Sequence, residues 1–84
     1  MIRVLLFASV RDRVGAGQVD VDMRDAGGDV ASLRRHLATR GGAWAEVFGD
    51  NDRLLVAINQ EMVPMHTVID DGDEVAFFPP VTGG

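Results

Sequence analysis

The 84 residues of this chain suffice for one domain, and their apolar fraction of 46% is ordinary for a globular protein. A net charge of −5 and the absence of cysteine exclude a basic nucleic-acid surface, a thiolate metal site and a cysteine nucleophile. No apolar stretch approaches the roughly 20 residues of a membrane helix. We therefore expect a soluble cytoplasmic protein that binds neither nucleic acid nor membrane and favours partners with basic patches.

Two strands are predicted near the N-terminus, where apolar residues recur at every second position. Residues 2–8 carry apolar side chains on both faces, which indicates a central strand. Residues 9–17 are polar and contain glycine, with room for a short helical turn at 9–14. Residues 19–23 alternate strictly, as a half-exposed strand does, and should pair antiparallel with the first strand.

A single amphipathic helix is predicted over residues 29–40. Asp29 is a suitable N-cap, and the Gly41-Gly42 pair should end the helix. The apolar residues at helical spacing are Val30, Leu33 and Leu37. They should pack against one face of the strands, formed by Ile2, Val4, Leu6, Val56, Val75 and Phe77. Residues 43–48 are expected to form a short turn in which Trp44 and Phe48 cap the core.

Three further strands complete the predicted domain. Residues 54–58 are typical of a buried strand, and residues 61–63 of a short edge strand that Pro64 limits. An acidic turn at 70–73 leads into the last strand, residues 74–78. Strands on either side of one amphipathic helix predict an α+β fold, with a mixed sheet and one main helix packed across it.

The usual catalytic and metal-binding constellations are missing. His36 and His66 lack the paired spacing of metal ligands and are expected to be solvated or packed. The acidic cluster at residues 70–74 lacks the spacing of a calcium loop, so we interpret it as a turn with a solvated or partner-facing rim. We predict no metal site.

The C-terminal residues 79–84 are predicted to form a flexible tail behind a domain of residues 1–78. Pro79 and Pro80 should end the sheet, because proline cannot donate to a ladder, and should stiffen the chain that leaves it. At about 3.3 Å per residue the tail reaches roughly 20 Å.

The end of this tail carries the predicted working group. A partner can grip Val81 and Thr82, whereas Gly83 and Gly84 have no side chains and can thread a narrow channel. The Gly84 carboxylate would then reach a buried active site. A frayed terminus without function is the alternative.

Strand alternation also predicts a second apolar face on the sheet, opposite the helix. Its residues are Leu5, Phe7, Leu55 and Phe78. A clustered apolar patch on a small monomer usually marks an interface, so we expect a partner there. The alternative is a second small core layer that loops cover.

Residues 71–84 resemble the terminal run of the molybdopterin synthase small subunits, the MoaD-like sulfur carriers of the MoaD/ThiS family. Residues 4–12 are similar to that family's first strand and turn, and residues 55–60 to its middle strand and reversal. The resemblance covers the whole chain. It implies a ubiquitin-like β-grasp fold and a place in a heterotetrameric synthase.

The resemblance also implies a sulfur-transfer cycle at Gly84. An E1-like adenylating enzyme would use ATP to turn the carboxylate, a poor electrophile, into an acyl-adenylate. A sulfur donor protein would convert it to a thiocarboxylate, since this chain has no cysteine. The large molybdopterin synthase subunit would accept the tail, and sulfur would pass to cyclic pyranopterin monophosphate in molybdenum cofactor biosynthesis. The catalytic side chains would belong to these partners, and this chain would bind no cofactor itself.

Two other functions remain open on the sequence. One is a sulfur carrier for thiazole synthesis or tRNA thiolation. The other is a ubiquitin-like binding module with no carrier chemistry.

Overall fold

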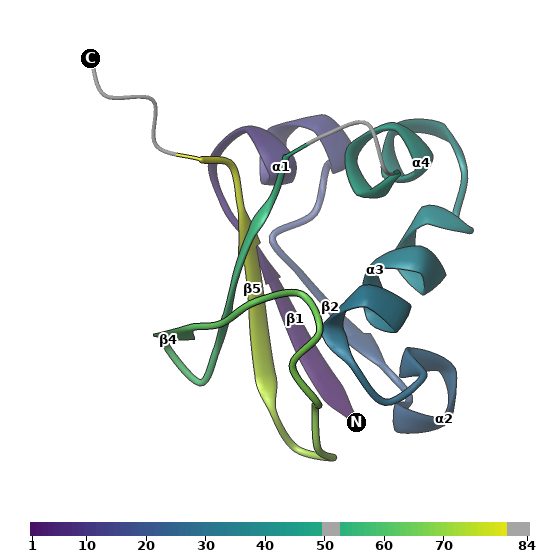
Figure 1. Cartoon of the computed structure of the whole chain (residues 1–84). Helices are drawn as coiled ribbons and strands as arrows, with labels where there is room; N and C mark the ends of the chain where they lie inside the picture. Colours follow the sequence, from purple (N-terminus) through teal and green to yellow (C-terminus); the bar gives the residue numbers. More distant parts are fainter. Residues whose placement is uncertain (50–52, 81–84) are drawn as a thin grey trace.

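A computed structural model describes residues 1–49 and 53–80, which form a five-stranded mixed sheet with helices on one face (Figure 1). The strands lie side by side in the order β2, β1, β5, β3, β4. In chain order they are β1 (Ile2–Leu6), β2 (Gln18–Val21), β3 (Leu55–Ile58), β4 (Glu61–Met62) and β5 (Glu74–Phe78). The mixed sheet of the predicted α+β fold is therefore confirmed.

The first and last strands of the chain are neighbours at the centre of the sheet. β1 and β5 run parallel, with Leu6 opposite Phe77. β2 pairs antiparallel with β1, and β3 pairs antiparallel with β5. β4 forms the outer edge beyond β3, as the position of Pro64 predicts. β1 thus pairs with β5 as far as Phe77, and β3 pairs with it as far as its last residue, Phe78, which lies opposite Leu55.

The main helix is α3 (Val30–Ala38), and it begins where the sequence predicts. The Asp29 side chain is the N-cap, and its Oδ1 accepts a hydrogen bond from the backbone N–H of Ser32 at 2.8 Å. The last residue of α3 is Ala38, and Thr39 is its C-cap. Gly41, with φ of 78°, does not end α3 but is the N-cap of the next helix. The predicted range of 29–40 is therefore too long by about half a turn at its C-terminal end.

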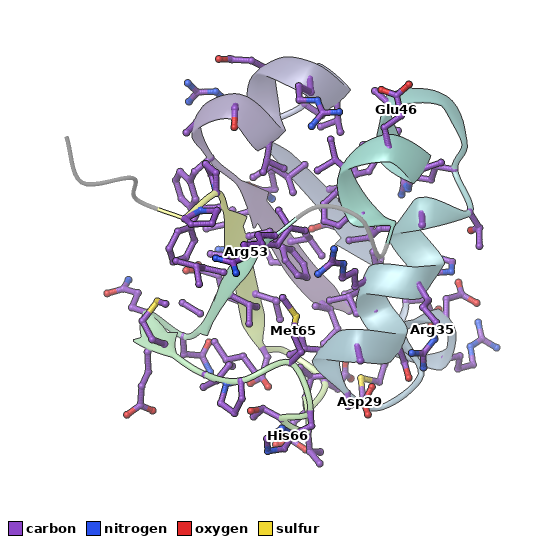
Figure 2. All side chains as sticks on the ribbon, turned by 45° about the horizontal axis from the view of Figure 1, so that its top comes forward. Asp29, Arg35, Glu46, Arg53, Met65 and His66 are labelled. Atoms are coloured by element: carbon purple, nitrogen blue, oxygen red, sulfur yellow. The ribbon has the colours of Figure 1, made fainter. Side chains whose placement is uncertain are left out.

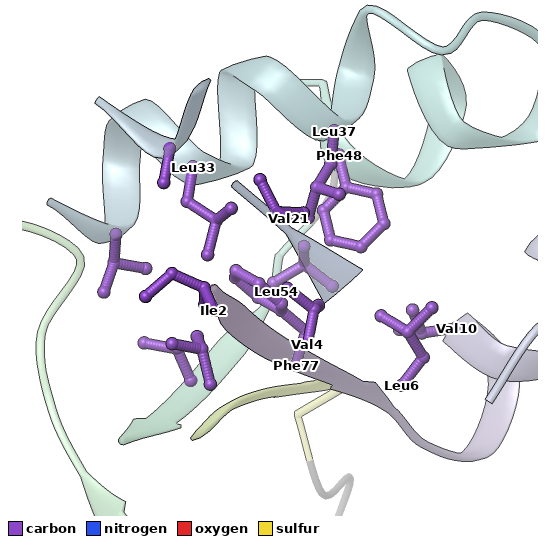
Figure 3. Close-up of a cluster of buried hydrophobic side chains, with 14 of the residues drawn as sticks. Ile2, Val4, Leu6, Val10, Val21, Leu33, Leu37, Phe48, Leu54 and Phe77 are labelled. Atoms are coloured by element: carbon purple, nitrogen blue, oxygen red, sulfur yellow. The ribbon is translucent and has the colours of Figure 1, made fainter. Parts of the chain in front are cut away.

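The core lies between α3 and one face of the sheet, as predicted (Figure 3). The apolar side of α3 is completely buried at Val30, Leu33 and Leu37. All six strand residues expected to face it belong to the same cluster: Ile2, Val4, Leu6, Val56, Val75 and Phe77. Alternation of the strands and the helical period of α3 direct these side chains into one layer.

The described residues contain three further helices, where the sequence predicts only turns or the end of a strand. They are α1 (Ala8–Val14), α2 (Met23–Ala26) and α4 (Gly42–Phe48). α1 takes the place of the suggested turn at 9–14, and α4 that of the short turn at 43–48. α2 begins at Met23, so the predicted strand at 19–23 is wrong in its last two residues. Short helices form mainly through tertiary packing, because a few turns are marginal by themselves.

Each of these helices contributes to the common core. Val10 of α1, Ala26 of α2 and Phe48 of α4 are all buried there. The Phe48 ring meets Phe77 edge to face, with 5.2 Å between centroids, and stacks on Trp44 at 5.7 Å. The helices therefore lie on the same face of the sheet as α3. The expected capping of the core by Trp44 and Phe48 is confirmed.

Arg34 joins α3 to the end of α4. Its Nε and Nη2 donate to the carbonyl oxygens of Phe48 and Gly49, at 3.0 and 2.6 Å. These carbonyls lie at the C-terminus of α4, where a cation is stabilised by the helix dipole. No local sequence pattern predicts this contact, because it depends on where α4 packs.

Candidate functional site

The candidate site begins where the chain leaves β5. Pro79 lies outside any strand and lines a small hollow of about 70 Å³, together with Ser9 of α1, Val47 of α4 and Arg53. Figure 2 shows Arg53 near the point where β5 ends. Pro79 and Pro80 are both half-buried. The base of the predicted tail is thus seated between the end of the sheet, the first turn of α1 and the last turn of α4.

The predicted working end of the tail comprises Val81, Thr82, Gly83 and Gly84, and it lies outside the described residues. The division into a domain of residues 1–78 and a tail of residues 79–84 therefore stays a prediction. So does the role of the Gly84 carboxylate.

The predicted second apolar face is present on the sheet, opposite the helices. Leu55 of β3 lies directly opposite Phe78 of β5, and Leu5 of β1 is opposite Ala76. These side chains alternate with the buried core residues, so they point away from α3. We call this surface, formed by Leu5, Phe7, Leu55, Ala57, Met62, Ala76 and Phe78, the outer face.

Among the described residues no helix covers the outer face, since all four contribute to the core on the other side (Figure 1). Leu5, Leu55 and Phe78 are half-buried, and Phe7 is 45% exposed. The alternative of a second core layer under loops therefore has no support in the described part of the chain.

Met62 is a member of the outer face that the sequence analysis missed. It lies opposite Ala57 across the β3–β4 hairpin and is 56% exposed. Residues that are directly opposite in an antiparallel pair share a face, so the face extends to the edge strand. The tight turn at Asn59-Gln60, which the sequence does show, fixes this register and could have identified Met62.

The far end of the sheet, away from the tail, is polar. Here Arg3 and Glu74 form an ion pair of 3.7 Å, next to an open hollow of about 430 Å³. Asp73 accepts hydrogen bonds from the Asn59 side chain and the Asp70 backbone, at 3.1 and 2.8 Å. Residues 70–73 thus form a turn, as predicted, which leads into β5 and bounds the outer face at one end.

The histidines and carboxylates of residues 1–49 and 53–80 form no group of three that could hold a metal ion. Asp29 and His66 lie together on the side of the molecule away from the start of the tail (Figure 2). No helix in that same part of the chain is long and apolar enough to cross a membrane.

The described residues thus combine a central parallel β1–β5 pair, an antiparallel β1–β2 pair at the N-terminus and a helix crossing one face of the sheet. This arrangement defines the chain as a ubiquitin-like β-grasp protein, with an uncovered apolar face beside the strand that leads to its C-terminus. The model of the ThiS family matches residues 4–84, and the chain belongs to this family.

Three similar proteins extend this result. The molybdopterin synthase sulfur carrier subunit of Escherichia coli is 48% identical over 86 residues, and that of Haemophilus influenzae 42% over 84 residues; both matches cover the whole of each chain. The crystal structure of SAMP1 from Haloferax volcanii is 33% identical, with a TM-score of 0.78 over 99% of this chain and 98% of that one.

Proposed function

We propose that this chain is the sulfur carrier subunit of a molybdopterin synthase and works through its C-terminal carboxylate. The observation that carries the proposal is the place of β5. This strand is the last element of the described fold and contributes Ala76 and Phe78 to the apolar outer face. The chain continues from it to the Gly83-Gly84 terminus. Sequence identities of 42% and 48%, over the full length of two proteins named as such subunits, support the same function.

The chemistry requires activation of Gly84. A carboxylate has no good leaving group, so a partner adenylating enzyme uses ATP to form the acyl-adenylate and releases pyrophosphate. Sulfur carried as a persulfide on a donor protein then attacks the acyl carbon, and AMP leaves. A thiol breaks the S–S bond of the resulting acyl disulfide, which releases the thiocarboxylate and leaves a disulfide on the donor side. With no cysteine in the chain, the sulfur comes from outside it. In this proposal the chain binds no cofactor of its own, because its partner binds the ATP. The cycle would run in the cytoplasm.

The two glycines explain how the carboxylate reaches a buried centre. Gly83 and Gly84 present only backbone, so they fit a channel too narrow for side chains. Pro79 and Pro80 keep the chain extended as it leaves the sheet. The catalytic side chains of this sulfurtransferase belong to the large subunit, which receives the tail together with the pterin precursor.

The outer face supplies the docking surface for these partners. It lies beside the start of the tail, so a partner that covers Phe7 and Phe78 also receives the residues that follow Pro80. An apolar patch of this kind on a small protein usually marks an interface. Burial of the patch therefore positions the tail without any catalytic group on this chain.

The test is the intact mass of the chain after incubation with ATP, the adenylating enzyme and a sulfur source. The wild-type chain should gain the mass of one sulfur-for-oxygen exchange, and only when ATP is present. Removal of Gly84 shortens the tail by about 3.3 Å, and a misplacement of even 1 Å can cost about a hundredfold in rate. Gly83→Val keeps the length but adds a branched side chain to the channel. Neither variant should form the thiocarboxylate.

Thermal melting of both variants should match the wild type, because neither change touches the core. A charged wild-type chain should then lose its sulfur to the pterin precursor only when the large subunit is added. Transfer to a thiazole-forming or tRNA-thiolating enzyme instead would assign the chain to another pathway. Thiocarboxylate on the chain without Gly84 would show that the tail is not the working group.

A further inference from the structure

One residue next to the outer face has a backbone conformation that its side chain does not favour. Ala8 has φ of 51°, in the left-handed region where a Cβ atom is disfavoured. Asn59 and Gln60 also have positive φ, but they form the two-residue β3–β4 turn, which requires it. Ala8 lies in no such turn, and its side chain has no polar group to compensate.

The hydrogen bonds of the preceding residue, Phe7, explain why the chain must turn at Ala8. The Phe7 N–H donates to the carbonyl oxygen of Phe77 at 3.2 Å, which extends the β1–β5 ladder by one bond. The Phe7 carbonyl oxygen accepts from Val10 and Arg11, at 3.1 and 3.3 Å, and so begins α1. Phe7 is therefore both the end of the ladder and the N-cap of a helix.

These contacts leave a single residue to redirect the chain from the sheet to the helix. α1 lies on the core side, where Val10 is buried to 2% exposure. Alternation along the strand directs the Phe7 side chain to the opposite side, at the outer face, and 45% of the residue is exposed. A strained residue that persists in a fold is held there by its surroundings, and such residues gather at functional sites.

We propose that Ala8 is a positioning residue: its left-handed conformation holds the exposed Phe7 ring on the outer face, ready for the partner. An aromatic side chain that is already fixed loses little conformational freedom on binding, which favours affinity. This inference rests on the proposed function, because it takes the outer face as the docking surface.

The test is a double-mutant cycle on affinity for the large synthase subunit, measured by calorimetry with the full chain. Ala8→Val places a β-branched residue at positive φ, where it is a strong outlier. We expect it to weaken binding about tenfold when Phe7 is present, and less than about twofold in the Phe7→Ala background. Ala8→Gly adopts the same φ freely and should bind within about twofold of the wild type.

The matched control is Gly15→Val at the other end of α1. Gly15 has φ of 77° with nothing near its Cβ position, so valine strains the backbone there too, but away from Phe7. This variant should melt at a lower temperature and keep its affinity. Melting of each variant checks folding, and if Ala8→Val does not fold, Ala8→Leu replaces it in the same cycle.

An equal loss of affinity in both backgrounds, or no loss at all, would overturn the role of Ala8. If Phe7→Ala alone binds as well as the wild type, the outer face is not the docking surface and the inference falls with it. Thiocarboxylate formation at Gly84 is a separate measurement, so it would still decide the carrier function in that case.

Discussion

Asp29 stabilises the start of α3 through its side chain. The backbone N–H of Ser32 donates to its Oδ1 at 2.8 Å, and this hydrogen bond, with a smaller contribution from the Ser32 side chain, lowers the pKa of Asp29. The charged form of Asp29 is therefore favoured in the folded chain. An aspartate titrates near pH 3.9 when unfolded, so the stabilisation is present above about pH 4 and is lost as pH falls through the lower, folded pKa.

We predict that Asp29→Ala lowers the melting temperature by a few degrees at neutral pH, because the first turn of α3 loses its cap. The difference from the wild type should shrink as pH falls below about 4. Asp29→Asn is the control, since asparagine caps equally well but does not titrate. Melting curves from acid to neutral pH would test this, and an Asp29→Ala chain that melts like the wild type at pH 7 would contradict it.

At the scale of elements, the buried side of α3 dominates the packing. Leu33 is fully buried between the helix and the sheet, and a leucine in such a place leaves a cavity when it is truncated (Figure 3). On the exposed side of the same helix, Arg35 makes one local hydrogen bond, to the Ser32 hydroxyl at 3.1 Å.

We predict that Leu33→Ala lowers the free energy of unfolding by about 2–5 kcal/mol. Arg35→Ala should change it by no more than about 0.5 kcal/mol, because surface substitutions rarely do more. Urea unfolding of the two variants measures both values. Similar losses in the two variants would mean that α3 does not pack on the sheet through Leu33.

At the scale of the whole molecule, the two faces of the sheet have different tasks. In the described part of the chain, four helices close one face, and the other carries exposed apolar side chains on and around β5, the strand that leads to the C-terminus. Val68 is also exposed, at 68%, but it lies in the segment paired with Asp29 at the start of α3. Met62 on the outer face and Val68 on the helical side are therefore a matched pair of exposed apolar residues for testing which surface binds partners.

We predict that Met62→Asp weakens binding to the large synthase subunit about tenfold or more, because it places a charge in an apolar interface. Val68→Asp should leave the affinity unchanged. Both chains should remain folded, since both positions are exposed. Calorimetric titration gives the two affinities, and a loss for Val68→Asp with none for Met62→Asp would move the interface to the helical side.

The sequence by itself determined the strands, the main helix and the two faces of the sheet. Alternation in β1 and β5 assigned Val4 and Phe77 to the core and Leu5 and Phe78 to the outer face, because the period of a strand is a local property. The Asp29 cap was predictable for the same reason, since it acts within one turn. The family resemblance, which the terminal run at residues 71–84 carries most clearly, was confirmed by the match of the ThiS family to residues 4–84.

Tertiary structure decided what depends on residues far apart in the chain. The short helices α1, α2 and α4 have weak patterns of their own and are stabilised by burying Val10, Ala26 and Phe48 in a shared core. Arg34 binds the end of α4 only because that helix packs beside α3. The positive φ at Ala8 arises because the β1–β5 ladder ends and α1 begins at the same residue, Phe7. A conflict of this kind between two elements is not visible in any local sequence pattern.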